Sequence, residues 1–479
     1  MLLDSFLWAF LAALPGTSGN SLLASKKLCA MSQWTVVKTK ALESPRGPQE
    51  GSRISYAWRA LRHRNFRLFF GGQTISLMGT WMTRLATSWL VYRLTGSPFL
   101  LGVVGFAGQI PTFLLAPLAG VWVDRLNRRN VLLVTQFLAM LQSLALAALA
   151  LSHRINIREI IALSAFQGLI NAFDMPGRQT FLVEMVEEKQ DLGNAIALNS
   201  SMVNMARLVG PSLAGAVIAL SSEGYCFLLD GISYLAVILS LALMRLRGAA
   251  LKGSAHSMLV QLKEGWEYVS SSPPIRTILL LFALVSLMGW PFTVLMPIFA
   301  GKILHGGPHT LGFLMGAVGV GALVSALSLA VRKTVLGLGK MIPLSTAAFG
   351  LGLMAFGFSR IFWVSLLLML VCGFGMMQQM AASNTIIQTI VEDSKRGRVM
   401  SFYTVAFVGM APFGSLLAGG LAHLIGAPYT VMFSGVCCLA GAAWFATRLS
   451  TIRAFMRPIY RELGILPPAA AIVQDSLGR

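Results

Sequence analysis

The chain has 479 residues, of which 56% are hydrophobic and only 12% charged, and its formal net charge is +20. A soluble domain carries about 25% charged residues, so this composition excludes an ordinary soluble protein. It indicates a chain dissolved in lipid, where apolar runs of about 20 residues cross the hydrocarbon as helices that satisfy their own backbone hydrogen bonds.

The N-terminal segment 1–57 differs from the rest of the chain. LWAFLAALPG, within it, resembles the apolar core of a signal peptide, but it is too short to span, and Asp4 is the only charge before it. We expect either a disordered extension or a start site placed too early, with Met31 as the start. An amphipathic cytoplasmic helix at 54–67 is predicted to lead into the first span.

Long apolar runs follow in close succession. We predict an all-α membrane protein with twelve transmembrane helices, at 67–92, 99–122, 130–151, 157–178, 195–220, 225–245, 277–299, 310–331, 341–359, 361–384, 400–423 and 428–447. The first, fourth and fifth of these runs are the least purely apolar.

A weak internal repeat divides these runs into two sets of six. Residues 185–215 can be laid on 390–419, so that Gly215 meets Gly419. An even number of spans per repeat gives both halves the same orientation, and such parallel repeats place a substrate site between the halves. We therefore predict two six-helix pseudo-repeats at 58–245 and 277–448, joined by a central cytoplasmic loop at 246–276 and followed by a cytoplasmic tail at 449–479.

The positive charge follows the predicted topology. Of the 38 Lys and Arg residues, 16 lie in the loops after even-numbered runs and 5 in the loops after odd-numbered runs. This bias places both termini in the cytoplasm. Nucleic-acid binding would need a folded basic face, and none is evident, so we expect no nucleic-acid partner.

Cofactor and enzyme signatures are missing from the sequence. The five cysteines have no CxxC spacing and the six histidines form no ligand pattern, so we expect no metal and no cofactor. No GxxxxGK[ST], HExxH or GxSxG motif occurs, which argues against ATP hydrolysis and against an enzyme. If such a chain moves solute across the membrane, it must draw on an ion gradient, and we expect protons to be the coupling ion.

A charged loop between the second and third runs carries a family resemblance. GVWVDRLNRRNVL resembles the loop signature of the major facilitator superfamily, with Asn127 where the signature has glycine. We expect Asn127 to replace that glycine because asparagine also tolerates a left-handed turn. FRLFFGGQTISLMGTWM, FDMPGRQTFLVEMV, ARLVGPSLAG and RGRVMSFY together resemble the bacterial enterobactin-exporter-like branch, which holds siderophore exporters and multidrug:proton antiporters.

The resemblance implies a gating role for this loop. Asp124 would cap the N-terminal end of the eleventh span, near 398–401, and Arg128 would pair with Asp174 at the inner end of the fourth span. The alternative is that the charges only fix topology. The candidate gating residues are Gly120, Asp124, Arg125, Arg128, Arg129 and Asp174.

Polar stripes mark a candidate cavity, because polar side chains inside lipid usually face the bundle interior. The first, fourth and fifth runs each gather polar side chains within a narrow arc at helical spacing. The second half carries fewer polar residues and is expected to offer an apolar, aromatic wall that includes Trp290. The candidate cavity residues are Gln73, Arg84, Gln167, Asn171, Asn204, Arg207, Asp230, Gln378 and Gln379.

Three charges inside spans are the sharpest of these candidates. Arg84 and Arg207 could bind a substrate anion or serve coupling, or they could form structural ion pairs or, for Arg84 above all, extend toward the membrane surface. Asp230 could carry a proton or serve as the structural partner of an arginine. GPSLAG, with Gly210, Pro211 and Gly215, resembles the antiporter signature on the fifth helix, or it serves simple helix packing.

We therefore predict a monomeric secondary transporter in a bacterial inner membrane. It would export a small amphipathic compound, siderophore-like or drug-like, by alternating access with proton antiport. The alternatives are an importer or uniporter of a small metabolite and, in another class, a receptor or scaffold that keeps the fold without moving solute. Intramembrane arginines favour transport, because a scaffold has no need of them.

Overall fold

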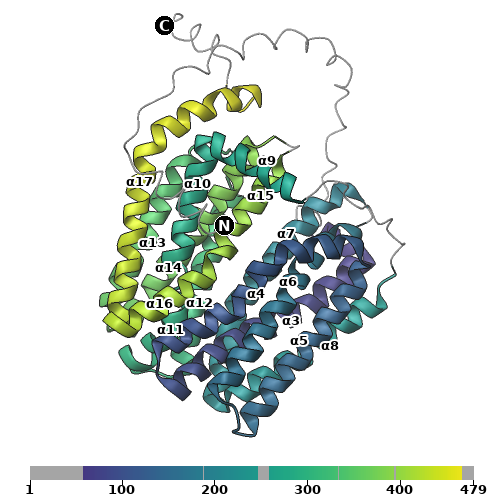
Figure 1. Ribbon diagram of the computed structural model, residues 1–479, viewed down its shortest axis with the longest axis vertical. Coiled ribbons are helices and arrows are strands. Elements are labelled where there is room, and N and C mark those ends of the chain that lie inside the picture. The colour runs from purple at the N-terminus through teal and green to yellow at the C-terminus, as the bar shows by residue number, and fades with distance from the viewer. Residues whose placement is uncertain (1–57, 187, 246–257, 333, 393–394, 467–479) are drawn as a thin grey trace, which may run out of the picture. The chain divides into compact units, whose positions relative to one another are not determined.

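The computed structural model describes residues 58–466 apart from 187, 246–257, 333 and 393–394, and the regular structure of this part is entirely helical. The predicted extension at 1–57 and the first part of the predicted central loop, 246–257, lie outside the described residues. Figure 1 shows long helices running side by side.

The helices of the first half follow the predicted runs but extend beyond several of them. They are η1 (Arg59–Arg62), α3 (Arg64–Thr95), α4 (Pro98–Arg125), α5 (Arg128–Leu151), α6 (Ile157–Glu184), η2 (Lys189–Asp191), α7 (Leu192–Leu220) and α8 (Glu223–Leu243).

Two runs of the second half are divided by short π-helical segments. The elements are α9 (Met258–Ser271), α10 (Pro273–Leu284), η3 (Val285–Gly289), α11 (Phe292–Ile298), η4 (Phe299–Ile303), α12 (Pro308–Ala330), α13 (Leu338–Phe358), α14 (Phe362–Ile390), α15 (Arg396–Thr404), η5 (Val405–Gly409), α16 (Ala411–Ile425) and α17 (Ala427–Glu462). The last helix continues through the first part of the predicted tail.

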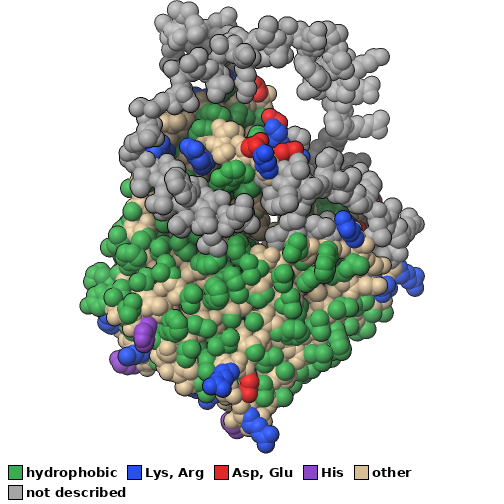
Figure 2. Space-filling model, viewed as in Figure 1, with side chains coloured by type: hydrophobic (Ala, Val, Ile, Leu, Met, Phe, Trp, Pro, Cys, Tyr) green, Lys and Arg blue, Asp and Glu red, His purple; other side chains and the backbone are tan. Residues whose placement is uncertain are grey.

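Ten helices of the described residues are long and apolar enough to cross a membrane. α3 and α6 are also long, at 32 and 28 residues, but they are not among the ten. Both carry the polar stripes noted in the sequence, which lower their hydropathy. On the face drawn in Figure 2, hydrophobic side chains cover most of the described surface, and charged side chains lie mostly toward its margins.

Side-chain caps begin three helices of the first half. Ser97 caps α4 by accepting from the amide of Leu100, and Asn156 forms a capping box with Glu159 at the start of α6. Asn127 caps α5 by accepting from the amide of Asn130, with a φ of −67°. The left-handed turn that we predicted for Asn127 is therefore wrong, because its side chain caps the next helix from an extended backbone.

The two halves use the same set of helix pairings. In the first half, α8 packs against α3 and α5, α6 against α4 and α5, and α7 against α3. In the second half, α17 packs against α10 and α13, α14 against α12 and α13, and the run of α15, η5 and α16 against the run that begins with α10. Each pairing of the first half thus has a counterpart at the equivalent position of the second.

The halves meet through α7 with α12 and α4 with α16. Glycines make these contacts close: a β-carbon on Gly102 would lie 2.6 Å from the carbonyl oxygen of Ser415, and one on Gly215 would lie 3.1 Å from the Cα of Gly312. Gly102 and Gly312 lie near the starts of α4 and α12, on the side of the turn between α3 and α4. We call this side the α3–α4 end and the opposite side the α4–α5 end.

Candidate functional site

Two arginines and a tryptophan of the first half form the centre of the candidate site. The guanidinium of Arg84, on α3, lies 4.8 Å from the ring centre of Trp81, and that of Arg207, on α7, lies 5.3 Å from the same ring. Gly210 makes this approach possible, because a β-carbon there would lie 2.6 Å from the β-carbon of Trp81. One indole therefore contacts both cations.

The second half meets this cluster through Trp290. The guanidinium of Arg207 lies 5.8 Å from the ring centre of Trp290, which in turn makes an edge contact of 5.0 Å with Phe407. Phe407 stacks on Phe282 at 5.2 Å. An unbroken series of ring and guanidinium contacts thus joins α3 and α7 to the second half.

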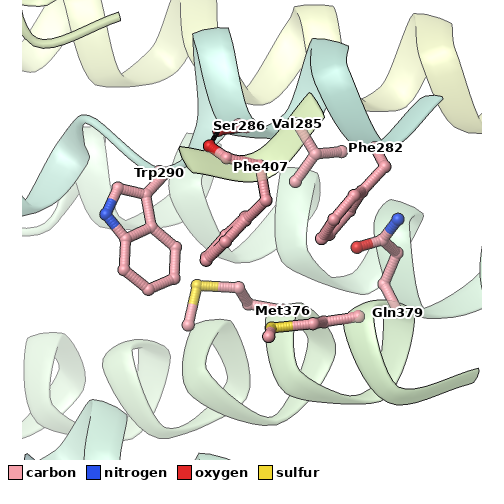
Figure 3. A pocket seen from close by; sticks show the side chains of 8 residues that line it. Phe282, Val285, Ser286, Trp290, Met376, Gln379 and Phe407 are labelled. Atoms are coloured by element: carbon pink, nitrogen blue, oxygen red, sulfur yellow. Dashed lines mark hydrogen bonds between the residues drawn. The ribbon is translucent and has the colours of Figure 1, made fainter. Parts of the chain in front are cut away.

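A small pocket lies beside Trp290 and Phe407 (Figure 3). Its remaining lining is Phe282, Val285, Ser286, Met376, Gln379 and Met380. Gln379 is 1% exposed, and its side-chain oxygen has no hydrogen-bond partner among the described residues. The pocket therefore offers aromatic and thioether surface together with one buried polar acceptor.

Two π-helical segments shape this wall. Val285 and Ser286 belong to η3, and Phe407 belongs to η5. The Ser286 hydroxyl donates to the carbonyl oxygen of Phe407, which ties the two segments together. π-Segments occur often at functional sites, because the wider turn displaces side chains and frees carbonyls.

Asp230, on α8, lies near Arg84 and is 2% exposed. One carboxylate oxygen accepts from the Ser143 hydroxyl at 3.0 Å, and the other has no hydrogen-bond partner among the described residues. Asp230 and Arg84 interact electrostatically, but no ion pair within 4.0 Å joins them. Gly79 gives the carboxylate its space, because a β-carbon there would lie 2.6 Å from the free oxygen.

The polar stripe of α6 is largely satisfied within the protein. Asp174 is buried and pairs with Arg178, and it accepts from Thr135 at 3.1 Å and from Gln136 at 2.7 Å. Gln167 donates to Asn171 at 3.3 Å, and its own oxygen is buried without a partner in the described structure.

The remaining cavity candidates fall into two environments. Gln73 is buried on α3, and Gln378 is buried between helices, where it accepts from Ser325 at 2.6 Å. Asn204 is half-exposed on α7 and donates to the Ser200 carbonyl oxygen at 3.0 Å. The structure therefore brings Arg84, Arg207 and Asp230 into one region, with Gln379 on the facing wall, and places Gln378 in a packing interface.

The charged loop makes different contacts from those we predicted. Arg128 pairs with Glu184 at the end of α6, whereas Asp174 pairs with Arg178 one turn away on its own helix, so the predicted pairing of Arg128 with Asp174 is wrong in this arrangement. Arg128 pairs with Glu184 because α6 continues to this residue, whose carboxylate lies nearer to the start of α5 than that of Asp174 does.

The other loop residues have separate environments. Arg129 donates to the carbonyl oxygens of Leu241 and Ala242 at 2.8 Å each, and so caps the end of α8. Arg125 is exposed, and a β-carbon on Gly120 would meet nothing within 4 Å. The side chain of Asp124 lies outside the described residues.

The start of the eleventh run is held by the central-loop helix. Arg398, on α15, pairs with Glu264 on α9. A β-carbon on Gly265 would lie 2.9 Å from the ring of Phe402, so α9 packs closely on this segment. Among the described residues α4 and α15 make no extensive contact, so the cap that we predicted between them is not formed by these parts of the chain.

The GPSLAG motif of α7 serves two interfaces. Gly210 admits Trp81 of α3, and Gly215 admits the backbone of α12 in the other half. Pro211 is buried between them, and a β-carbon on Gly312 would lie 2.9 Å from its carbonyl oxygen. The motif therefore places Arg207 while keeping α7 close to both neighbours.

Trp81, Phe282, Met376 and Phe407 were not predicted from the sequence. Aromatic and thioether side chains are common on every apolar helix, so no pattern distinguished these four. Their only sequence signal is that Trp81 and Arg84 lie three residues apart, on the same helical face as the predicted polar stripe.

Comparison with known proteins places the whole helical region in one group. A family model described as transmembrane secretion effector matches residues 55–458. The staphyloferrin A transporter of Staphylococcus aureus is 26% identical over 387 residues, covering 80% of this chain and 96% of that protein. The multidrug efflux pump Tap of Mycolicibacterium fortuitum is 26% identical over 390 residues, covering 79% and 95%.

Solved structures share the fold at low sequence identity. A transporter of the POT family in complex with 5-aminolevulinic acid has a TM-score of 0.66 at 11% identity, covering 81% of this chain and 96% of that one. A bacterial homologue of the lysosomal transporter Spinster, in an inward-facing and unoccupied conformation, has a TM-score of 0.62 at 12% identity, covering 85% and 99%.

Proposed function

Because this chain belongs to the transmembrane secretion effector family and is a membrane transporter of the major facilitator superfamily, we propose that it exports a small amphipathic compound by alternating access coupled to proton entry. The observation that carries the proposal is the cluster of Trp81, Arg84, Arg207 and Trp290, in which charged and aromatic side chains join the two halves. A binding site for an amphipathic compound needs both a polar and an apolar surface.

The proposed architecture has twelve transmembrane helices in two six-helix repeats. Ten spans satisfy the criteria of length and hydropathy, and we assign α3 and α6 as the other two. Each has the length to cross, and its polar side chains face the bundle. The matching helix pairings of the two halves support the repeat.

The proposed location is a bacterial inner membrane with both termini in the cytoplasm. The excess of Lys and Arg in the loops after even-numbered spans supports this orientation. The α4–α5 end would then be cytoplasmic and the α3–α4 end would face outward.

Alternating access is supported by where the halves touch. Gly102 with Ser415 and Gly215 with Gly312 bring backbones together at the α3–α4 end. Among the described residues, neither α10 nor α15 makes extensive contact with the first half near the α4–α5 end. The arrangement therefore fits an exporter open to the cytoplasm, and the other state would need this end to close.

The charged loop is proposed as the latch of that closing step. Arg128 would keep its pairing with Glu184 in the open state, and Asp124 would reach the start of α15 when α4 approaches it. Arg398 is held by Glu264 of α9 in the meantime. Fixing of topology alone is the alternative role of these charges.

Proton coupling is proposed to use Asp230. It is a buried carboxylate with one hydrogen bond from Ser143 and one oxygen without a partner among the described residues, and it lies close to Arg84. A buried carboxylate can take up or release a proton when a nearby charge, here that of Arg84, is neutralised or moves away.

Efflux from living cells tests the proposal. Expression in an efflux-deficient bacterial host should raise tolerance to at least one amphipathic drug or raise siderophore secretion, and Arg207→Gln at equal protein level should remove the gain. An importer or uniporter would instead raise sensitivity or uptake, and a receptor or scaffold would leave both readouts at the level of the empty host.

A further inference from the structure

We propose that the cluster of Trp81, Arg84, Arg207 and Trp290 is a binding site for an organic anion with an aromatic body. The anionic group would bridge Arg84 and Arg207, and the aromatic body would lie against Trp290. This rests on the proposed transport function and specifies the class of its substrate.

The two arginines form no ion pair with any carboxylate of the described residues. They repel each other electrostatically across the shared indole of Trp81. The Nε of Arg207 is buried and has no hydrogen-bond partner in the part of the chain that the structure describes. Arg84 is exposed and Arg207 is half-buried, so a ligand can reach both guanidiniums. Two cations held side by side attract an anion that can bridge them, so the site has the electrostatics of a receptor for an anion.

The same bundle contains an arginine that does have a structural role, and it differs in this respect. Arg178 pairs with Asp174, whose other contacts come from Thr135 and Gln136. Asp230 interacts electrostatically with Arg84 but forms no ion pair with it, and it lies against Ser143. Among the described residues, Arg178 thus has a carboxylate in direct contact, whereas two guanidiniums, Arg84 and Arg207, share one more distant carboxylate.

The apolar side of the site accounts for the rest of the ligand. Arg207 lies over Trp290, and Trp290 meets the edge of Phe407. The small pocket behind these rings is lined by Phe282, Met376 and Gln379, so the surface beside the two cations is aromatic and apolar (Figure 3). The ligand class is therefore an aromatic carboxylate, sulfonate or phosphate, whose rings would stack on Trp290.

A matched pair of probes tests the charge requirement. The purified full-length chain in lipid nanodiscs is titrated calorimetrically with 2-naphthalenesulfonate and with the neutral 2-naphthalenesulfonamide, which has nearly the same size and ring system. We expect the sulfonate to bind at least about tenfold more tightly, because only it can neutralise the two guanidiniums.

Variants assign the effect to the two arginines. Arg84→Gln and Arg207→Gln should each remove the preference for the sulfonate, while Arg154→Gln, in an exposed turn between α5 and α6, should keep it. Thermal unfolding of the unliganded variants gives the second readout. Arg84→Gln and Arg207→Gln each lose cation–π contacts but also relieve the repulsion between the two cations, so they should lower the unfolding midpoint less than Arg178→Gln, which breaks a buried ion pair.

Equal binding of the two probes, or no binding of the sulfonate, would overturn the anion site. A fall in the unfolding midpoint of Arg207→Gln as large as that of Arg178→Gln would also overturn it, by assigning Arg207 a structural role. These results leave the export proposal standing, since export of neutral or cationic compounds would persist. Selective sulfonate binding without efflux of any compound would instead contradict export and keep the anion site.

Discussion

Arg125 and Arg129 lie in the same charged loop but do different things. Arg129 donates two hydrogen bonds to the last carbonyls of α8, whereas Arg125 is exposed at the end of α4. A cation at a helix C-terminus is favourable, both through hydrogen bonds to carbonyls without helical partners and through the helix dipole. At the residue scale, then, one charge of the loop stabilises the fold and another is available for topology or gating.

Arg129→Gln should lower the stability of the first half. Losing charge-assisted hydrogen bonds at a partly exposed site should cost about 1 to 2 kcal/mol, measured as a lower unfolding midpoint of the purified protein. Arg125→Gln is the matched control and should leave the midpoint unchanged. If both variants unfold at the wild-type temperature, the capping role of Arg129 is refuted.

The sequence identifies charges that lie close together in the fold, but it does not predict the contacts they make. Arg84, Arg207 and Asp230 stand out because charges are rare in apolar runs. The partner of Arg128 could not be predicted, because the choice between Asp174 and Glu184 depends on how far α6 continues beyond its apolar run. Phe407 and Met376 carried no signal, because packing alone distinguishes them from other apolar residues.

At the scale of elements, glycine contacts control how closely the halves approach. A β-carbon on Gly102 would lie 2.6 Å from the Ser415 carbonyl oxygen and 2.9 Å from the Cα of Gly419, both backbone atoms that cannot rotate away. Gly419 and Gly420 follow one another on α16. Gly419 faces Gly102 of α4, whereas a β-carbon on Gly420 would have nothing within 4 Å. Gly420 is therefore a position of the same helix where an added methyl group meets no neighbour.

Gly102→Ala should disfavour the closed α3–α4 end. Overpacking costs about 1 to 3 kcal/mol, and a shift of that size in a two-state equilibrium changes populations roughly five- to 150-fold. We expect efflux to fall accordingly while the amount of protein in the membrane stays normal, and Gly420→Ala should retain wild-type efflux. Full efflux by Gly102→Ala would mean that this contact does not limit the transport cycle.

The π-segments η3 and η5 could not be predicted from hydropathy. Both fall in runs that read as continuous apolar spans, and the departure from α-helical geometry lies just before Pro291 and Pro412, each of which lacks a backbone amide donor. The hydroxyl of Ser286 joins the two segments through the Phe407 carbonyl. The wall of the pocket thus depends on a distortion shared by two runs.

For the whole molecule, composition and loop charge were enough to predict a multi-pass membrane protein, and the motifs that resemble the major facilitator superfamily added the prediction of a transporter. The arrangement of the halves was beyond sequence, because alternating access gives one chain at least two packings of similar stability. Backbone contact at the α3–α4 end identifies one of them.

Uptake into everted membrane vesicles tests the central claim most directly. Their cytoplasmic face points outward and respiration acidifies the lumen, so a proton-coupled exporter should move fluorescent amphipathic compounds from the medium into the lumen. We predict that wild-type vesicles accumulate at least one compound from a panel that includes 2-naphthalenesulfonate and ethidium. A protonophore should abolish this accumulation, as should Asp230→Asn at equal protein level. Vesicles that accumulate no compound beyond the empty-host level, or that retain full accumulation with the protonophore, would contradict proton-driven export.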